Sequence, residues 1–320
     1  MRPTTLATVA CLLVCADSSA WAYVREVNDR QLPLFWASNC ELVTVYPNGW
    51  TGLDATTIGK SAAAAAAAWG STVQCPTASG TSTASPSFDI VVAPAPPGAV
   101  GTVGVDYSNN IVFVQSDWMY AEDALALTHH SADSSGRIVD TDIEVNATRP
   151  DKVWTNLDPG ASTIGGNGRE VYDLQTVLTH EFGHFIGLSH TCFGGSNGGS
   201  DAESGTPIDR VDDQGLPIPE CSDNGTSSNP ASYASVMWYI VDPGSSARRS
   251  LTPDDVHAVC SMYPPSPSSV CPLNQQNDGC GCESAGGASS GRGAVLLLGV
   301  CVAFRRRRRT VSGPVPRRRR

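Results

Sequence analysis

Residues 180–190 read HEFGHFIGLSH, and this stretch decides how the rest of the chain is interpreted. His180 and His184 stand four residues apart, so on a helix their side chains share one face. Two imidazoles on one face can bind one Zn²⁺ ion. Gly187 lets the chain leave the helix in a sharp turn, because glycine adopts a positive φ at little cost. We expect that turn to bring His190 back as the third ligand.

Glu181 adds a chemical function to this metal site. Its position next to His180 does not suit a ligand, but its carboxylate can reach a water molecule on the ion. Three protein ligands leave the fourth position of a tetrahedral zinc ion open, as in catalytic rather than structural sites. The ion lowers the pKa of that water, and Glu181 takes the proton. The alternative, a helix of ordinary surface or core histidines, does not explain Glu181, Gly187 and His190 together.

Charge is unevenly distributed along the 320 residues. The net charge is −10, yet nine of the 21 basic residues are arginines in two C-terminal runs, 305–309 and 317–320. The remainder of the chain is therefore far more acidic than the net charge suggests. Such a body repels phosphate backbones, which argues against nucleic-acid binding. Its length is enough for a sizeable hydrophobic core.

The N-terminal residues 1–22 are predicted to be a signal peptide. Arg2 precedes an apolar stretch over 6–15, and Ala20-Trp21-Ala22 has the pattern of a cleavage site. We expect cleavage after Ala22 and a secreted or cell-surface protein. A buried N-terminal helix and a lipoprotein modified at Cys15 are the alternatives.

The C-terminal end has two parts beyond a catalytic body. Residues 265–290 are expected to be a flexible tether that contains Cys280-Gly281-Cys282. Residues 291–320 combine an apolar run, Gly293–Phe304, with the arginines; a spanning helix needs about 20 apolar residues. The arrangement resembles a MYXO-CTERM sorting tail, which implies a C-terminal processing enzyme as partner and transient membrane contact. The alternative is a weak tail anchor that stays in place.

Six cysteines remain once the two termini are set aside. An even number in an exported chain predicts disulfides, although spacing alone allows 15 pairings. We expect sequential pairing, because each bond then closes a modest loop worth roughly 3 kcal/mol. The expected bonds are Cys40–Cys75, Cys192–Cys221 and Cys260–Cys271.

Residue patterns predict a mixed α/β (α+β) fold. The expected features are a twisted mixed sheet, an edge strand that aligns substrate by backbone pairing, an active-site helix and a C-terminal helix. Thr252 is a predicted N-cap, followed by Pro253 at the first helical position. Strands are expected over 42–46, 88–92, 111–115, 125–130 (the edge strand) and 137–145, helices over 54–69, 173–188 and 252–262, and a long loop over 191–230.

The histidine motif resembles that of the metzincin metallopeptidases. The resemblance implies a Met-turn, for which Met237 fits, 47 residues after His190. The resemblance covers about residues 32–264 and is strongest from Arg137 onward, and we expect one catalytic domain over residues 23–264. Several segments are similar to matrixins in particular, namely 138–145 with Val153-Trp154-Thr155, 177–181, 251–256 and Met262-Tyr263.

Tyr239 departs from the matrixin pattern, which usually has proline there. It is similar instead to astacin-like and serralysin-like metzincins, whose tyrosine contacts the zinc or the transition state. The resemblance thus implies a catalytic role for Tyr239, with interface packing as the alternative. His129 and His130 lack the spacing of the second matrixin zinc site. We expect one to point inward and one outward from an edge strand.

The loop after His190 could hold Ca²⁺, since carboxylates among glycines suit that ion. Its acidic residues are Asp201, Glu203, Asp209, Asp212 and Asp213. The alternative is a solvated acidic loop.

Together these features predict a secreted zinc-dependent endopeptidase acting on proteins or peptides. Two alternatives stay open: a metal-binding cell-surface or adhesion protein with little or no turnover, and a calcium-dependent binding module with a vestigial site. Glu181 argues against the first alternative, because zinc binding alone does not require it.

Overall fold

The computed structural model describes residues 23–48, 50–94, 103–156, 169–194, 211–212, 215, 217–221 and 230–266. The predicted signal peptide, the Cys280–Cys282 motif and the arginine-rich tail lie outside these residues. Within them, no helix combines the length and the apolar character that crossing a membrane requires.

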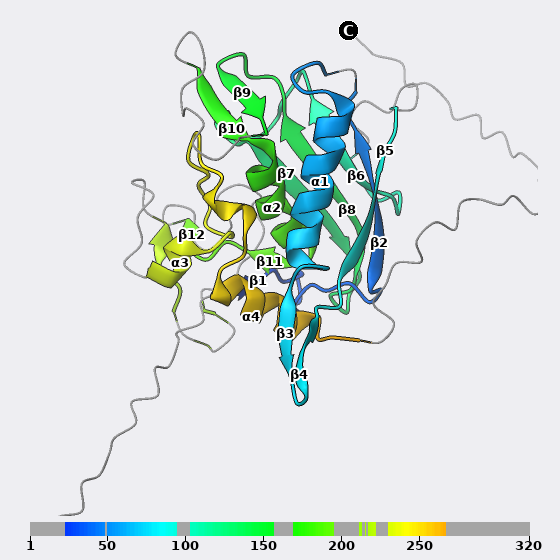
Figure 1. Ribbon diagram of the computed structural model, residues 1–320, viewed down its shortest axis with the longest axis vertical. Helices are drawn as coiled ribbons and strands as arrows, with labels where there is room; N and C mark the ends of the chain where they lie inside the picture. The colour runs from blue at the N-terminus through cyan, green and yellow to red at the C-terminus, as the bar shows by residue number, and fades with distance from the viewer. Residues whose placement is uncertain are drawn as a thin grey trace, which may run out of the picture. The chain divides into compact units, whose positions relative to one another are not determined.

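A five-stranded sheet forms the centre of the described part, with α1 and α2 packed together beside it (Figure 1). Its last strand, β7, runs antiparallel to β8 at one edge, and the other neighbours are parallel. The predicted mixed sheet is therefore present, and the strand expected over 125–130 is an edge strand. In spatial order the strands are β5 (Ser87–Val92), β2 (Cys40–Tyr46), β6 (Asn109–Val114), β8 (Ile138–Asn146) and β7 (Ala126–Ala132).

Helix α1 (Ala55–Trp69) packs on α2 (Leu174–Phe185), and three of the six buried residues of α1 are alanines, which allows a close approach. Asp54 caps α1 by accepting a hydrogen bond from the Thr57 amide, which satisfies an otherwise unpaired donor. At the other end, the Trp69 indole donates to the Thr179 carbonyl at 2.6 Å. Small side chains and this bond fix α2, which carries the first two histidines, against the core.

Helix α4 (Pro253–Met262) begins where the sequence predicts. Thr252 and Asp255 form a reciprocal capping box, with proline in the first turn. The buried Asp255 carboxylate also accepts hydrogen bonds from the Ser235 hydroxyl and the Val236 amide. The start of α4 therefore holds the segment that leads into Met237.

Several short elements were not predicted, because two to five residues carry too little periodicity to be recognised. The N-terminal strand β1 (Val24–Arg25) pairs with β11 (Leu188–Ser189), directly before His190. The others are β3 (Gln74–Thr77), β4 (Gly80–Thr83), β9 (Lys152–Thr155), β10 (Glu170–Asp173), β12 (Phe193–Gly194), β13 (Glu220–Cys221), α3 (Pro230–Ala234) and the 3₁₀ turn η2 (Ala247–Arg249).

Two of the three expected disulfides are wrong. Cys75 bonds to Cys260 across 185 residues of sequence, which excludes both Cys40–Cys75 and Cys260–Cys271. Cys40 is itself in a disulfide. Sequential pairing would close modest loops, whereas the fold lays β3 against α4 and brings the Cα atoms of Cys75 and Cys260 within 5.5 Å. The third bond, Cys192–Cys221, is present as expected.

Candidate active site

The entry to α2 is fixed by a buried carboxylate. Asp173 caps the helix by accepting from the Thr176 amide at 2.9 Å and its hydroxyl at 2.6 Å. Arg249 donates to both oxygens of the same carboxylate, at 2.5 and 2.7 Å. Charge-assisted bonds of this kind are stronger than neutral ones. They set the position of the helix that carries His180, Glu181 and His184.

The three predicted ligands meet at one point. The Nε2 atoms of His180, His184 and His190 lie 3.1 to 3.2 Å from one another, and all three side chains are buried. Among the described residues, this is the group of histidine, cysteine and acidic side chains that could hold a metal ion. Spacings of this size fit three nitrogen ligands that each lie about 2.0–2.1 Å from one zinc ion.

Backbone acceptors indicate the tautomers of two of these ligands. The Nδ1 atom of His180 is 2.8 Å from the Val236 carbonyl, and that of His184 is 2.8 Å from the Leu188 carbonyl. Each Nδ1 must therefore carry the proton, which leaves an Nε2 lone pair facing the centre. Lone pairs so close repel one another unless a cation lies among them. The donor set thus fits a zinc ion.

Burial and the neighbouring histidines also favour the neutral ligand form. Burial is the largest cause that lowers the pKa of His180 well below its usual value, and the charges of His184 and His190 lower it further. The Nε2 atom that binds the metal must carry no proton. The environment of His180 therefore suits metal binding at neutral pH.

Gly187 makes the turn that returns His190 to the site. Its φ is +93°, and a Cβ there would lie 2.7 Å from the Leu34 carbonyl oxygen. Both observations exclude a side chain at this position. The expected helix over 173–188 is too long, because α2 ends at Phe185 and the turn begins directly afterwards.

Met237 packs against the helix that carries the ligands. Its side chain is buried, and its Sδ would lie 2.1 Å from a Cβ built on Gly183. The Met237 carbonyl accepts a hydrogen bond from the Thr191 amide, next to His190. The predicted Met-turn residue therefore contacts both chain segments that supply the histidines.

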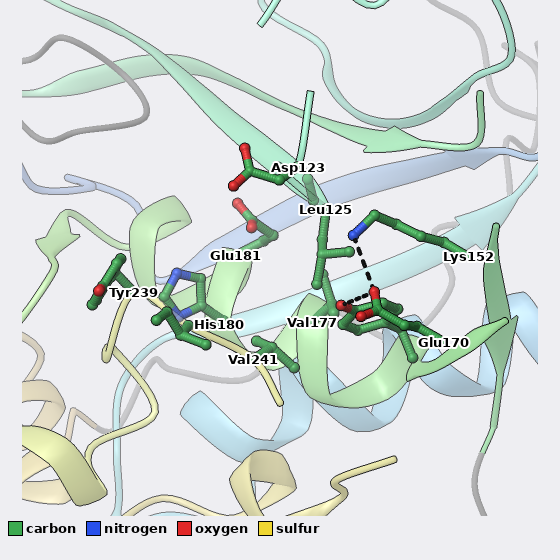
Figure 2. Close-up of a pocket in the computed structure, with 12 residues that line it drawn as sticks. Asp123, Leu125, Lys152, Glu170, Val177, His180, Glu181, Tyr239 and Val241 are labelled. Carbon is green, nitrogen blue, oxygen red and sulfur yellow. Dashed lines mark hydrogen bonds and ion pairs between the residues drawn. The ribbon is translucent and has the colours of Figure 1, made fainter. Parts of the chain in front are cut away.

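Glu181 lies at a pocket of about 480 Å³ together with His180 and Tyr239 (Figure 2). Its Oε2 atom accepts a hydrogen bond of 2.6 Å from the hydroxyl of Thr128 on β7. Thr128 could not be identified as a site residue from the sequence, since no local pattern links it to α2. The pocket is also lined by Asp123, Leu125, Ala126, Lys152, Glu170, Tyr172, Val177, Ile240 and Val241.

An ion pair between Lys152 and Glu170 lies across the pocket from His180, as Figure 2 shows. The Lys152 ammonium is 3.7 Å from the Glu170 carboxylate and 4.7 Å from the centre of the Tyr172 ring. The Tyr172 hydroxyl donates to Glu170 at 2.8 Å. Burial is the main cause that raises the pKa of Tyr172, followed by this hydrogen bond. Apolar side chains between the two ends make the pocket amphipathic.

Glu26 from the N-terminal segment was not predicted to approach the site. Its carboxylate is buried, with Oε1 at 3.1 Å from His184 Nδ1 and Oε2 at 3.0 Å from His130 Nδ1. Burial would raise the pKa of Glu26, but His130 and His184 outweigh it and lower that pKa to about 2. The Nε2 atom of His130 lies 2.8 Å from the His184 carbonyl.

The two histidines of β7 face opposite sides of the sheet, as the sequence predicted. His130 is directed inward, whereas His129 pairs with Glu144 at 2.9 Å and is more exposed.

Of the five acidic residues suggested for calcium, only Asp212 lies within the described residues. Tyr239 lines the pocket, with its ring centre 6.4 Å from that of His190.

The part of the chain that carries these histidines is similar to known metallopeptidases. Residues 164–234 match the Peptidase_M43 family model, described as "Pregnancy-associated plasma protein-A". The chain is 37% identical over 101 residues to "Extracellular metalloprotease 1" of Coccidioides posadasii, an alignment that covers 28% of this chain and 36% of that protein.

Two further relatives align over a shorter stretch. Extracellular metalloproteases of Colletotrichum graminicola and Verticillium alfalfae are 38% and 40% identical over 58 residues, which is 18% of this chain in each case. These alignments cover 21% and 20% of the two relatives. The chain thus spans about a third or less of the length of the curated relatives that it matches. Histidine geometry, a mixed α/β fold compatible with a metzincin-like domain, and these similarities are together those of a metallopeptidase domain.

Proposed function

We propose that this chain is a secreted zinc-dependent endopeptidase of the metzincin type. The observation that carries the proposal is the convergence of three buried Nε2 atoms beside the carboxylate of Glu181, at a pocket. The similarity of residues 164–234 to a metallopeptidase family supports it.

His180, His184 and His190 would hold the zinc ion, which when bound supplies a Lewis acid for the scissile carbonyl. Glu181 takes a proton from the attacking water and delivers it to the leaving amine, as a general base and then a general acid. Thr128 donates to one oxygen of that carboxylate and so orients it. Tyr239 lies on the same pocket, where its hydroxyl is suited to donate to the developing oxyanion.

The edge strand β7 gives the substrate backbone a place to pair. It lies at one edge of the sheet and supplies Thr128 to the site, so a peptide aligned along it would run past Glu181. The pocket between His180 and the Lys152–Glu170 pair then takes a side chain of the substrate. Its apolar walls favour a side chain with a long hydrophobic portion.

Secretion is proposed from the signal-peptide pattern of residues 1–22 and from relatives that are named extracellular metalloproteases. The cysteine motif and the arginine-rich tail further suggest removal of the C-terminus. The mature chain would then begin near Tyr23 and end near Cys280–Cys282. Intact mass of the protein from its native host tests this; a chain that retains Arg305–Arg320 would contradict it.

The central test of the proposed activity is cleavage of casein by the purified protein. We expect cleavage that a zinc chelator abolishes and that added zinc restores. Zinc bound in stoichiometric amounts without any cleavage would favour a metal-binding surface protein instead. Cleavage that persists after complete zinc removal would contradict the proposed mechanism.

A further inference from the structure

The N-terminal segment 24–26 pairs with the stretch of chain between two of the metal ligands, His184 and His190. Strand β1 pairs with β11, so that Val24 lies opposite Ser189 and Arg25 opposite Leu188. The Glu26 amide then donates to the Gly187 carbonyl at 2.9 Å. The backbone between His184 and His190 is therefore supported by a segment more than 150 residues earlier in the sequence.

Glu26 adds a side-chain contact to this backbone support. Its carboxylate lies 3.1 Å from Nδ1 of His184 and 3.0 Å from Nδ1 of His130. Both histidine side chains are 8% exposed and that of Glu26 is 6% exposed, so water does not screen the network. His130 in turn reaches the His184 carbonyl at 2.8 Å. The carboxylate thus has a histidine on each side.

We propose that Glu26 is a positioning residue for the metal site, a role that rests on the proposed zinc-dependent function. A carboxylate beside Nδ1 fixes the ring orientation of a metal-bound histidine and makes its Nε2 atom a stronger electron-pair donor to the metal. Glu26 does this for His184, and His130 holds the carboxylate in place from the other side. The N-terminal segment is therefore part of the metal site and not only of the core.

The test measures zinc affinity rather than catalysis. Zinc is titrated in competition with a chromophoric chelator into the parent protein and into Glu26→Gln and Glu26→Ala. Losing such a contact typically costs 10- to 100-fold in metal affinity, so we expect a loss in that range for both variants. Asp29→Asn is the matched control, because it removes an exposed carboxylate only three residues after Glu26. We expect its zinc affinity to equal that of the parent.

A purely structural role for Glu26 gives a different result. Melting of the zinc-free proteins would then shift, while the further rise in melting temperature on adding zinc would stay as large as in the parent. Our proposal predicts that this rise shrinks, because it reports zinc affinity directly. If both Glu26 variants fail to fold, His130→Gln replaces them, since it removes the second partner of the carboxylate and should also weaken zinc binding.

The inference can fail separately from the proposed function. A parent protein that binds zinc and cleaves casein, with zinc affinities of the Glu26 and His130 variants within about threefold of it, would overturn the role of Glu26 alone. The Leu188 carbonyl, 2.8 Å from the same Nδ1, would then be enough to hold His184. A parent that binds no zinc would overturn the proposed function itself.

Discussion

The hydroxyl of Thr128 donates a hydrogen bond of 2.6 Å to the carboxylate of Glu181, and both side chains are buried. This contact joins the edge strand β7 to the helix α2, across 53 residues of sequence. The strand on which we propose that substrate pairs is therefore also the strand that orients the proposed base. Under this proposal, substrate alignment and the geometry of the base both depend on the position of β7.

Replacing Thr128 by valine should lower kcat and leave KM nearly unchanged. Valine keeps the shape but removes the hydroxyl, and a hydrogen bond to a charged group is worth about 1.5–3 kcal/mol, or roughly 10- to 100-fold in rate. Thr128→Ser restores the donor and should recover most of the activity. Steady-state kinetics on a peptide substrate measure both variants. A serine variant as impaired as the valine variant would mean that packing, not the hydrogen bond, matters.

Removing one ligand should empty the metal site. His184→Ala deletes one of three converging nitrogens, so elemental analysis after dialysis should find far less than one zinc per chain. His129→Ala is the control, because His129 pairs with Glu144 away from the three ligands. Stoichiometric zinc in the His184 variant would remove the ligand assignment.

Glu181→Gln should separate metal binding from catalysis. The amide keeps the size of the side chain and can still accept from Thr128, but it is no longer a base. We expect parental zinc content and a fall in peptide cleavage of about 10²–10⁴-fold. Metal analysis and kinetics on the same preparation check both halves. Parental activity in this variant would exclude Glu181 as the base.

Tyr239→Phe should lower kcat more than it raises KM, if the phenol donates to the oxyanion. The loss of one such donor costs about 10²–10³ in kcat in well-studied enzymes. Tyr233→Phe is the matched control, since Tyr233 is exposed and does not line the pocket. An unchanged kcat in the Tyr239 variant would assign that side chain to packing.

Two helical glycines should respond differently to alanine. A Cβ at Gly183 would lie 2.1 Å from Met237 Sδ and 2.8 Å from a ring carbon of the buried Trp69. Overpacking of this kind typically costs about 1–3 kcal/mol, so Gly183→Ala should lower the melting temperature. A Cβ at Gly59 would lie 2.6 Å from a methyl group of Val92, but that side chain is 38% exposed, so we expect it to shift towards solvent.

Gly59→Ala should therefore be neutral, or stabilising by up to about 1 kcal/mol from helix propensity. Thermal unfolding of both variants, without zinc, gives the comparison. Equal melting temperatures for the two would show that Met237 does not pack tightly against α2.

The sequence alone predicted the local parts of this protein. An i, i+4 pair of histidines shares a helix face whatever the rest of the chain does, and Gly187 marks the turn, since few other residues adopt a positive φ. For the same reason the N-cap at Thr252 and the main strands were predictable: each depends on neighbours within a few residues. The ligand set could therefore be proposed from eleven consecutive residues.

Only the tertiary structure decided the contacts between distant segments. Glu26 reaches His184 across 158 residues, Thr128 reaches Glu181 across 53, and Cys75 bonds to Cys260 across 185. No local period records such pairings, because they follow from how strands are ordered in the sheet and which helix covers them. The disulfide prediction failed for this reason: it favoured short loops, whereas packing of β3 against α4 determined which thiols met.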